Sequence, residues 1–327
     1  MPGSDAVAEN LSTEVRGVST GVDKSALSRF LESEHGPFHC LIAGIAVLLS
    51  VILAVLFRLE HISVINLHPV LFALQCAVPL GGIAAYCHWA KHVKLRDGCW
   101  LVFWGCLFVN LLELPQYAAA RIGLPLHDAA LVRLDHIIGI DGGEIISWVQ
   151  RHPGFEAFSI WSYGLMPLMV FASVLIPAMF GQLRRAKEYL LATILASVLA
   201  AFVLALFPVI GPWAGFHFHP YWNQAWYGRE LSILRAPGPF TANPDYTCGL
   251  ITFPSFHIAL AVLGVFALWP FRWLRIPALI VAALIAVATV TTGWHYASDG
   301  LGGILVARLG IVLARKITSP RTLAAAR

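Results

Sequence analysis

The sequence predicts an all-α integral membrane protein with about eight transmembrane helices. Of the 327 residues, 58% are hydrophobic and only 12% are charged, and the mean hydropathy is +0.73. A soluble domain carries about 25% charged residues. Histidine-containing motifs also lie at the mouths of late apolar stretches, where ionisable groups are usually functional. The net charge of +4 is too small to indicate a nucleic-acid partner.

The expected spans follow from the length of the apolar stretches. A helix needs roughly 20 mostly apolar residues to cross a bilayer. The second stretch is long enough to tilt or to bend at Pro79, and Arg308 interrupts the last. In chain order, the expected spans cover about 38–57, 65–90, 99–119, 155–180, 188–209, 254–270, 274–292 and 298–317.

The polar segments divide the chain into regions. We expect a polar N-terminal tail over 1–37, two accessory spans over 38–98, a catalytic membrane core over 99–317 and a tail over 318–327. The core includes an outer loop over 211–253, whose many aromatic residues suit either an interfacial belt or an entry wall for a lipid. The mixture of apolar and charged residues in segment 120–154 predicts an amphipathic helix on the membrane surface, followed by a turn at Gly142-Gly143. A solvated linker is the alternative.

The distribution of Lys and Arg predicts the orientation, because cytoplasmic segments are enriched in these residues. With the N-terminus inside, fifteen of the 22 Lys and Arg residues lie in inner segments and six lie in outer segments, while Arg308 lies within the last span. The termini are therefore expected in the cytoplasm, and both histidine motifs open to the outer, periplasmic or lumenal, face.

Cysteine and histidine spacing gives no metal or redox signature. The six cysteines lack paired spacing, so neither a disulfide framework nor a zinc site is expected. His217 and His219 lack a third ligand nearby. We expect no metal and no cofactor.

The two motifs are Phe253-Pro254-Ser255-Phe256-His257 and His295-Tyr296-Ala297-Ser298-Asp299. A histidine can attack phosphorus and form a covalent phospho-histidine. Asp299 follows His295 by four residues, so it can share a helical face and orient the imidazole. His257 can protonate the leaving oxygen. Ser255 is expected to be the N-cap of a helix whose free N–H groups attract phosphate, and its hydroxyl could add a hydrogen bond.

Pro-Ser-x-His followed by His-x-x-x-Asp resembles the type 2 phosphatidic acid phosphatase superfamily, over roughly residues 150–317. Phe-Pro-Ser-Phe-His with His-Tyr-x-x-Asp is similar to the inositol phosphorylceramide synthase branch. The resemblance implies a six-helix phosphatase or phosphotransferase core, with His295 as nucleophile, Asp299 as its orienting carboxylate and His257 as general acid and base.

The phosphate clamp of that superfamily is missing. Thr289 stands where its arginine usually precedes the second histidine, and no Arg-Pro dipeptide occurs. Arg235 and Arg229 of the outer loop are the candidates to replace it. Glu113 of the third span could bind a headgroup hydroxyl or form a structural hydrogen bond with Tyr163.

The expected function is a metal-independent lipid phosphotransferase or phosphatase. The partner is a membrane lipid with a phosphate group, and the acceptor is water or a lipid alcohol such as a ceramide or diacylglycerol. A strict lipid phosphate phosphatase is one alternative, and a non-catalytic lipid-binding protein or transporter is another. Transporters usually place ionisable groups near the midplane, whereas these cluster at one face.

Overall fold

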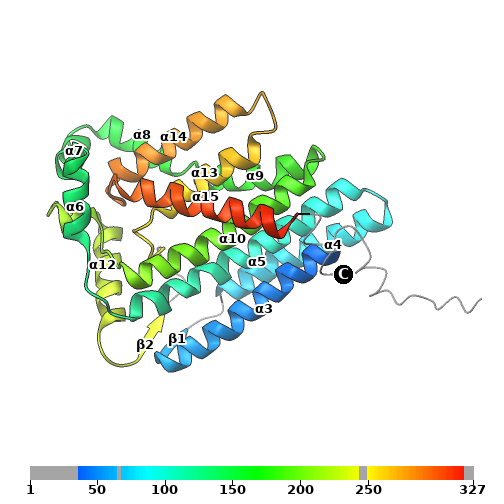
Figure 1. The fold of residues 1–327 in the computed structure, drawn as a ribbon, viewed down its shortest axis with the longest axis horizontal. Coiled ribbons are helices and arrows are strands. Elements are labelled where there is room, and N and C mark those ends of the chain that lie inside the picture. The colour runs from blue at the N-terminus through cyan, green and yellow to red at the C-terminus, as the bar shows by residue number, and fades with distance from the viewer. Residues whose placement is uncertain (1–35, 65–67, 243–248, 320–327) are drawn as a thin grey trace, which may run out of the picture. The chain divides into compact units, whose positions relative to one another are not determined.

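A computed structural model describes residues 36–64, 68–242 and 249–319 (Figure 1). The chain divides into two compact units, residues 1–41 and 42–327. The described residues of the first unit form the start of helix α3 (Gly36–Leu59). The features that follow belong to the second unit.

The chain is mostly helical. After α3 come β1 (Ile62–Val64), α4 (His68–Trp89), α5 (Val93–Arg121), α6 (Asp128–Ile137) and α7 (Gly142–Gln150). They are followed by α8 (Pro153–Tyr163), α9 (Met166–Met179), α10 (Leu183–Leu206), α11 (Pro212–Gly215) and α12 (Trp222–Arg235). The last elements are β2 (Phe240–Ala242), α13 (Phe256–Leu268), α14 (Arg275–Thr291) and α15 (Asp299–Ile317).

Four helical stretches in the described part of the chain are long and apolar enough to cross a membrane: Gly36–Leu59, Leu95–Arg121, Pro153–Met179 and Leu183–Leu206. Other apolar helices are shorter. The 13 residues of α13 span only about 20 Å, against a hydrocarbon core of about 30 Å. The protein therefore has the helices of a membrane protein, while the count of eight spans stays a prediction.

Helix α10 lies at the centre of the second unit. It packs against α5, α9, α13 and α15, and α13 in turn packs against α9, α14 and α15 (Figure 1). Small residues bring α15 close to its neighbours: a Cβ atom on Gly303 would overlap the Ser255 carbonyl oxygen, and one on Gly310 would lie 2.7 Å from the Ala192 carbonyl oxygen. Such contacts are typical of helix packing in membranes.

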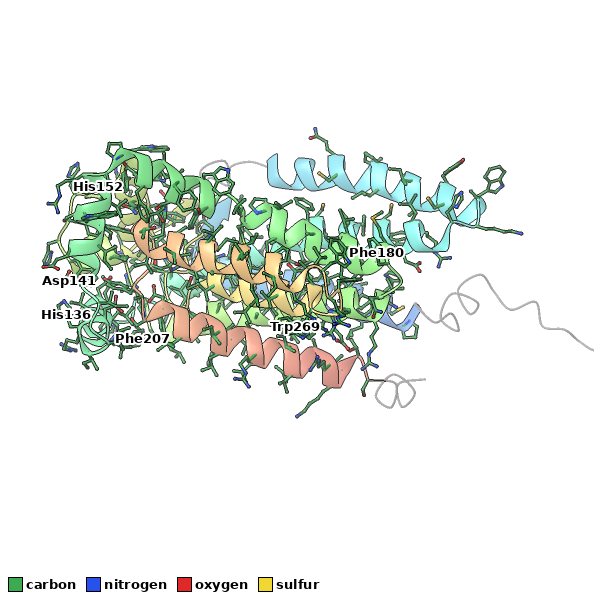
Figure 2. The ribbon with its side chains drawn as sticks, turned by 90° about the horizontal axis from the view of Figure 1, so that it is seen from above. His136, Asp141, His152, Phe180, Phe207 and Trp269 are labelled. Atoms are coloured by element: carbon green, nitrogen blue, oxygen red, sulfur yellow. The ribbon has the colours of Figure 1, made fainter. Side chains whose placement is uncertain are left out.

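The two ends of this bundle differ in character. At one end, the buried Glu188 carboxylate of α10 lies 2.9 Å from Arg184, 3.6 Å from Arg185 and 3.8 Å from Arg315 of α15. The starts of α13 and α15 lie at the other end, so both histidine motifs meet there, as expected. Figure 2 shows Phe180 and Trp269 well separated from His136, Asp141 and Phe207 along the helices.

Two features of the fold differ from the sequence prediction. β1 and β2 form a parallel pair in the register Ile62↔Phe240, which the all-α prediction did not include. Strands of three residues are too short to carry a period-2 pattern, and these are far apart in the sequence. The expected outer loop 211–253 also contains two helices, α11 and α12.

The prediction for 120–154 is wrong in its details. The segment forms two helices, and the chain turns at Gly139, whose φ is +78°, whereas Gly142 begins α7 behind the N-cap Asp141. α6 buries an acidic residue and exposes an apolar one: Asp135 is fully buried, while Ile137 is 80% exposed. The burial of Asp135 has a cause near the histidine motifs.

Candidate active site

A cavity of about 500 Å³ opens at the end of the bundle where the two histidine motifs meet. Residues from α5, α8, α12, α13 and α14 line it, together with the loops before α13 and α15. They are Gln116, Glu156, Ser159, Ile160, Tyr163, Tyr221, Trp222, Asn223, Gly249, Ile251, Thr252, Phe256, His257, Thr291, Thr292, Trp294 and His295.

The predicted triad residues lie together at this cavity. Nε2 of His295 is 3.4 Å from Nδ1 of His257, and Nδ1 of His295 is 3.3 Å from Oδ2 of Asp299. Asp299 is fully buried behind the histidine, and its Oδ2 also accepts a hydrogen bond of 2.9 Å from the Tyr296 amide. The three side chains thus form a continuous chain from a buried carboxylate to the cavity.

The tautomer of His295 follows from its partners. Its Nδ1 lies 2.8 Å from the Thr252 carbonyl oxygen, which can only accept, so Nδ1 carries the proton and Nε2 has the free lone pair. The side chain is 4% exposed, and burial lowers its pKa to about 4. A neutral imidazole with Nε2 at the cavity is a competent nucleophile at neutral pH.

His257 lies in the first turn of α13. Ser255 caps that helix, as predicted, and its hydroxyl accepts a hydrogen bond of 3.4 Å from the Ile258 amide. The hydroxyl oxygen of Tyr163 in α8 lies 3.3 Å from Nδ1 of His257, and the centroids of the two rings are 4.5 Å apart. The ring of His257 is therefore held by an aromatic neighbour and by the second histidine.

The remaining predicted binding residues lie elsewhere. Ser255 is fully buried at its cap and is not among the residues that line the cavity. Arg235 donates to the carbonyl oxygens of Ala120 and Leu124, where α5 ends, so the structure does not bring it to the histidines. Arg229 is exposed on α12, and Glu113 is half-buried on α5; neither lines the cavity.

A reciprocal contact explains the position of Arg235. Arg121 at the end of α5 donates to the carbonyl oxygens of Leu234, Ala236 and Gly238 at the end of α12. The two arginines thus join the ends of α5 and α12, and their guanidinium groups satisfy backbone carbonyls that a helix end leaves without partners.

The loop that carries His295 is held by residues that the sequence did not predict. The Asp135 carboxylate of α6 accepts hydrogen bonds of 3.0 Å from the Ala297 amide and 2.8 Å from the Ser298 amide. These are charge-assisted bonds inside a buried site, which are stronger than neutral ones. Asp135 therefore fixes the turn between His295 and Asp299.

A second carboxylate of α6 acts on the neighbouring segment. Asp128 accepts from the amides of Ile210 and Gly211, and its Oδ1 lies 2.9 Å from the Tyr296 hydroxyl. Seven residues separate Asp128 from Asp135, which places them on one helical face. That spacing was visible in the sequence. Because charged residues usually face solvent, it did not indicate that both carboxylates bind backbone amides inside the protein.

The cavity lining, where the structure describes it, lacks the positively charged side chains that usually bind a phosphate group. Its described lining residues include no Lys or Arg, and one carboxylate, Glu156 of α8. The Tyr221 hydroxyl donates a hydrogen bond of 2.6 Å to Glu156, and burial together with this carboxylate raises the pKa of Tyr221 to about 12. Within the described part of the chain, no group of three or more His, Cys, Asp or Glu residues could hold a metal ion.

Comparison with known proteins gives one match. The model of a family described as the PAP2 superfamily, the type 2 phosphatidic acid phosphatases, matches residues 129–313. The matched region includes α6 except its first residue, both histidine motifs and most of α15. No curated protein and no solved structure matches the chain.

Proposed function

We propose, on the premise that the chain belongs to the PAP2 superfamily, that it cleaves a lipid phosphoester through a covalent phospho-histidine intermediate. Membership of this superfamily suggests a lipid enzyme of the phosphatase or phosphotransferase type. The observation that carries the finer proposal is the chain of contacts from Asp299 through His295 to His257 at the wall of a cavity of about 500 Å³.

The reaction divides into two balanced steps. Nε2 of His295 attacks phosphorus, the P–N bond forms, and the bond from phosphorus to the leaving oxygen breaks while the protonated imidazole of His257 donates its proton to that oxygen and becomes neutral. His257 then takes a proton from the acceptor hydroxyl, whose oxygen attacks phosphorus and releases His295. The acceptor is a lipid alcohol or water.

The neighbours of His295 supply the electrostatic stabilisation. The imidazole becomes positively charged as the P–N bond forms, and the Thr252 carbonyl and the Asp299 carboxylate both face its Nδ1. Preorganised groups of this kind often provide the largest part of catalysis. The N-terminal end of α13, whose residues Phe256 and His257 line the cavity, favours negative charge on the phosphate.

The charge of the cavity favours a phosphodiester donor over a phosphomonoester. A monoester carries about −1.5 to −2 charges at pH 7, whereas a diester carries about −1. The described lining residues provide no Lys or Arg to balance a dianion, and Glu156 would repel it. We therefore infer that a phospho-headgroup is transferred to a lipid alcohol, as the resemblance to inositol phosphorylceramide synthases implies, and that hydrolysis of phosphatidic acid is the weaker activity.

Lipid mass spectrometry of membranes with and without the protein tests this function. We expect a new headgroup-bearing lipid and the matching alcohol product with the wild type, and neither with His295→Ala or His257→Ala at equal protein levels. Asp299→Asn should keep a small remnant, because the nucleophile remains but its orientation is weakened. Normal products from membranes containing His295→Ala contradict the proposal.

Purified protein in vesicles separates the two donor classes. Turnover of a phosphodiester lipid should exceed that of phosphatidic acid at the same surface concentration. Glu156→Gln should raise the activity on phosphatidic acid relative to the diester, because it removes the repelling charge. Glu144→Gln is the matched control, since Glu144 is exposed on α7 and lies outside this cavity. A wild-type preference for phosphatidic acid favours the strict phosphatase.

A further inference from the structure

A second cavity of about 300 Å³ lies next to the first, between α8 and α14. Its lining is almost entirely apolar. The contributing residues are Phe155, Phe158, Ser159 and Ser162 of α8, and Ile280, Ala283, Leu284, Val287, Ala288 and Thr291 of α14. We call it the α8–α14 groove.

The groove and the candidate active site share two wall residues. Ser159 and Thr291 line both cavities, and the Thr291 hydroxyl donates a hydrogen bond of 3.1 Å to Ser159. Among the described residues, these two alone line both cavities, and both side chains are buried. A molecule at the histidines therefore meets the apolar groove across one pair of hydroxyl groups.

The outer side of the groove is open. Phe158 and Val287, on opposite walls, are 46% and 56% exposed, and Ile280 further along α14 is 55% exposed. α8 belongs to one of the four helical stretches able to cross a membrane, and α14 is an apolar helix of 17 residues. In a bilayer these exposed side chains face lipid chains rather than water.

We propose that the α8–α14 groove holds an acyl or alkyl chain of the lipid substrate while its phosphate lies at His295. This rests on the proposed function and adds where the lipid enters. A lipid that moves sideways from the bilayer can keep its chain in apolar surroundings, so only its polar headgroup has to cross the Ser159–Thr291 pair. The continuity of groove and cavity at this pair identifies the occupant as part of the same molecule.

Filling the groove tests the proposal. Val287→Trp and Ala283→Trp should each lower turnover of a long-chain donor lipid in vesicles by about tenfold or more. A water-soluble donor with the same headgroup and very short chains does not need the groove, so its turnover should change less than about twofold. Leu279→Trp is the matched control, because Leu279 is exposed on the same helix but does not line the groove.

A photolabelling experiment with the wild type covers the case in which a tryptophan variant fails to fold. A donor lipid with a photoreactive group in its chain should label α8 or α14 peptides that contain groove residues, and excess unlabelled donor should compete. Labelling that is confined to other helices overturns the proposal. An equal loss on long and short donors, or unchanged turnover of the long donor by both variants, also overturns it. Failure of the wild type to turn over either donor instead refutes the proposed function, and the labelling result still decides the groove.

Discussion

At the scale of single residues, the candidate site depends on a buried neutral histidine rather than on a charged clamp. Burial lowers the pKa of His295 to about 4, below the ordinary value of 6.5. Its Nδ1 proton is held by the Thr252 carbonyl, so Nε2 is free to attack. In the proposed mechanism, the positive charge develops only during the reaction, next to Asp299.

This burial gives a pH prediction. Because His295 stays neutral until the pH approaches 4, kcat/KM for a phosphodiester lipid should not fall between pH 7 and pH 5.5. Initial rates in vesicles over this range provide the measurement, with protein integrity checked by gel filtration at each pH. A loss of activity centred near 6.5 would show that the nucleophile titrates as an ordinary histidine.

Asp135 gives a second prediction at this scale. Asp135→Asn replaces one carboxylate oxygen by an amide that cannot accept from the Ala297 or Ser298 amide, so the His295 turn loses a charge-assisted hydrogen bond. Such a bond is worth about 1.5–3 kcal/mol, so kcat should fall by roughly tenfold or more. KM should change little, because Asp135 does not line the cavity.

The control for Asp135 is Asp141→Asn. Asp141 lies in the next turn of the chain, is half-exposed and pairs with His136, so its loss should leave kcat nearly unchanged. Equal effects of the two substitutions, or an Asp135→Asn effect on KM alone, would argue that Asp135 does not position the histidine turn.

At the scale of elements, long apolar helices and the meeting of the two histidine motifs could be predicted from the sequence, because both follow from composition and spacing. The Ser255 cap was predictable for the same reason. The inward face of α6 was not, since a buried Asp135 contradicts the rule that charged residues face solvent. The Thr252 carbonyl carries no side-chain signal at all.

Helix packing by small residues gives a prediction for α15. Gly303→Ala places a methyl group against the Ser255 carbonyl oxygen, so α15 must move away from α13. Overpacking costs about 1–3 kcal/mol. We expect a lower midpoint of thermal unfolding in detergent and a lower rate, since both helices begin at the site. Gly105→Ala in α5 is the control, because a Cβ there meets nothing within 4 Å. Equal stability of both variants would contradict close α13–α15 packing.

At the scale of the whole molecule, the charge distribution predicts the orientation. A reporter fused after Arg327 should be cytoplasmic. In a cysteine-free background, Ser232→Cys should react with an impermeant thiol reagent in intact cells, because its side chain is exposed on α12, whose first residues line the cavity with both histidines. Gln182→Cys, between α9 and α10, should react only after lysis. The opposite labelling pattern would reverse the orientation.

The ends of the membrane helices were only partly predictable. Within the described residues, four helical stretches meet the length and composition needed to cross a bilayer, and the expected count of eight spans stays a prediction. α13 and α14 are shorter than the apolar stretches that contain them, because turns before and after each helix use apolar residues such as Phe253 and Trp273. Composition therefore predicts which stretches are apolar, but it does not predict the residue at which each helix ends.

The most direct test of the account is to trap the covalent intermediate. Purified protein in vesicles is mixed with donor lipid, quenched in alkali within milliseconds to seconds and digested for peptide mass spectrometry. We expect a phosphorus-containing adduct on His295 that disappears when acceptor is added and is absent from His295→Ala, which should also have lost turnover. Continued turnover by His295→Ala, or an adduct on a different residue of the active wild type, would contradict it.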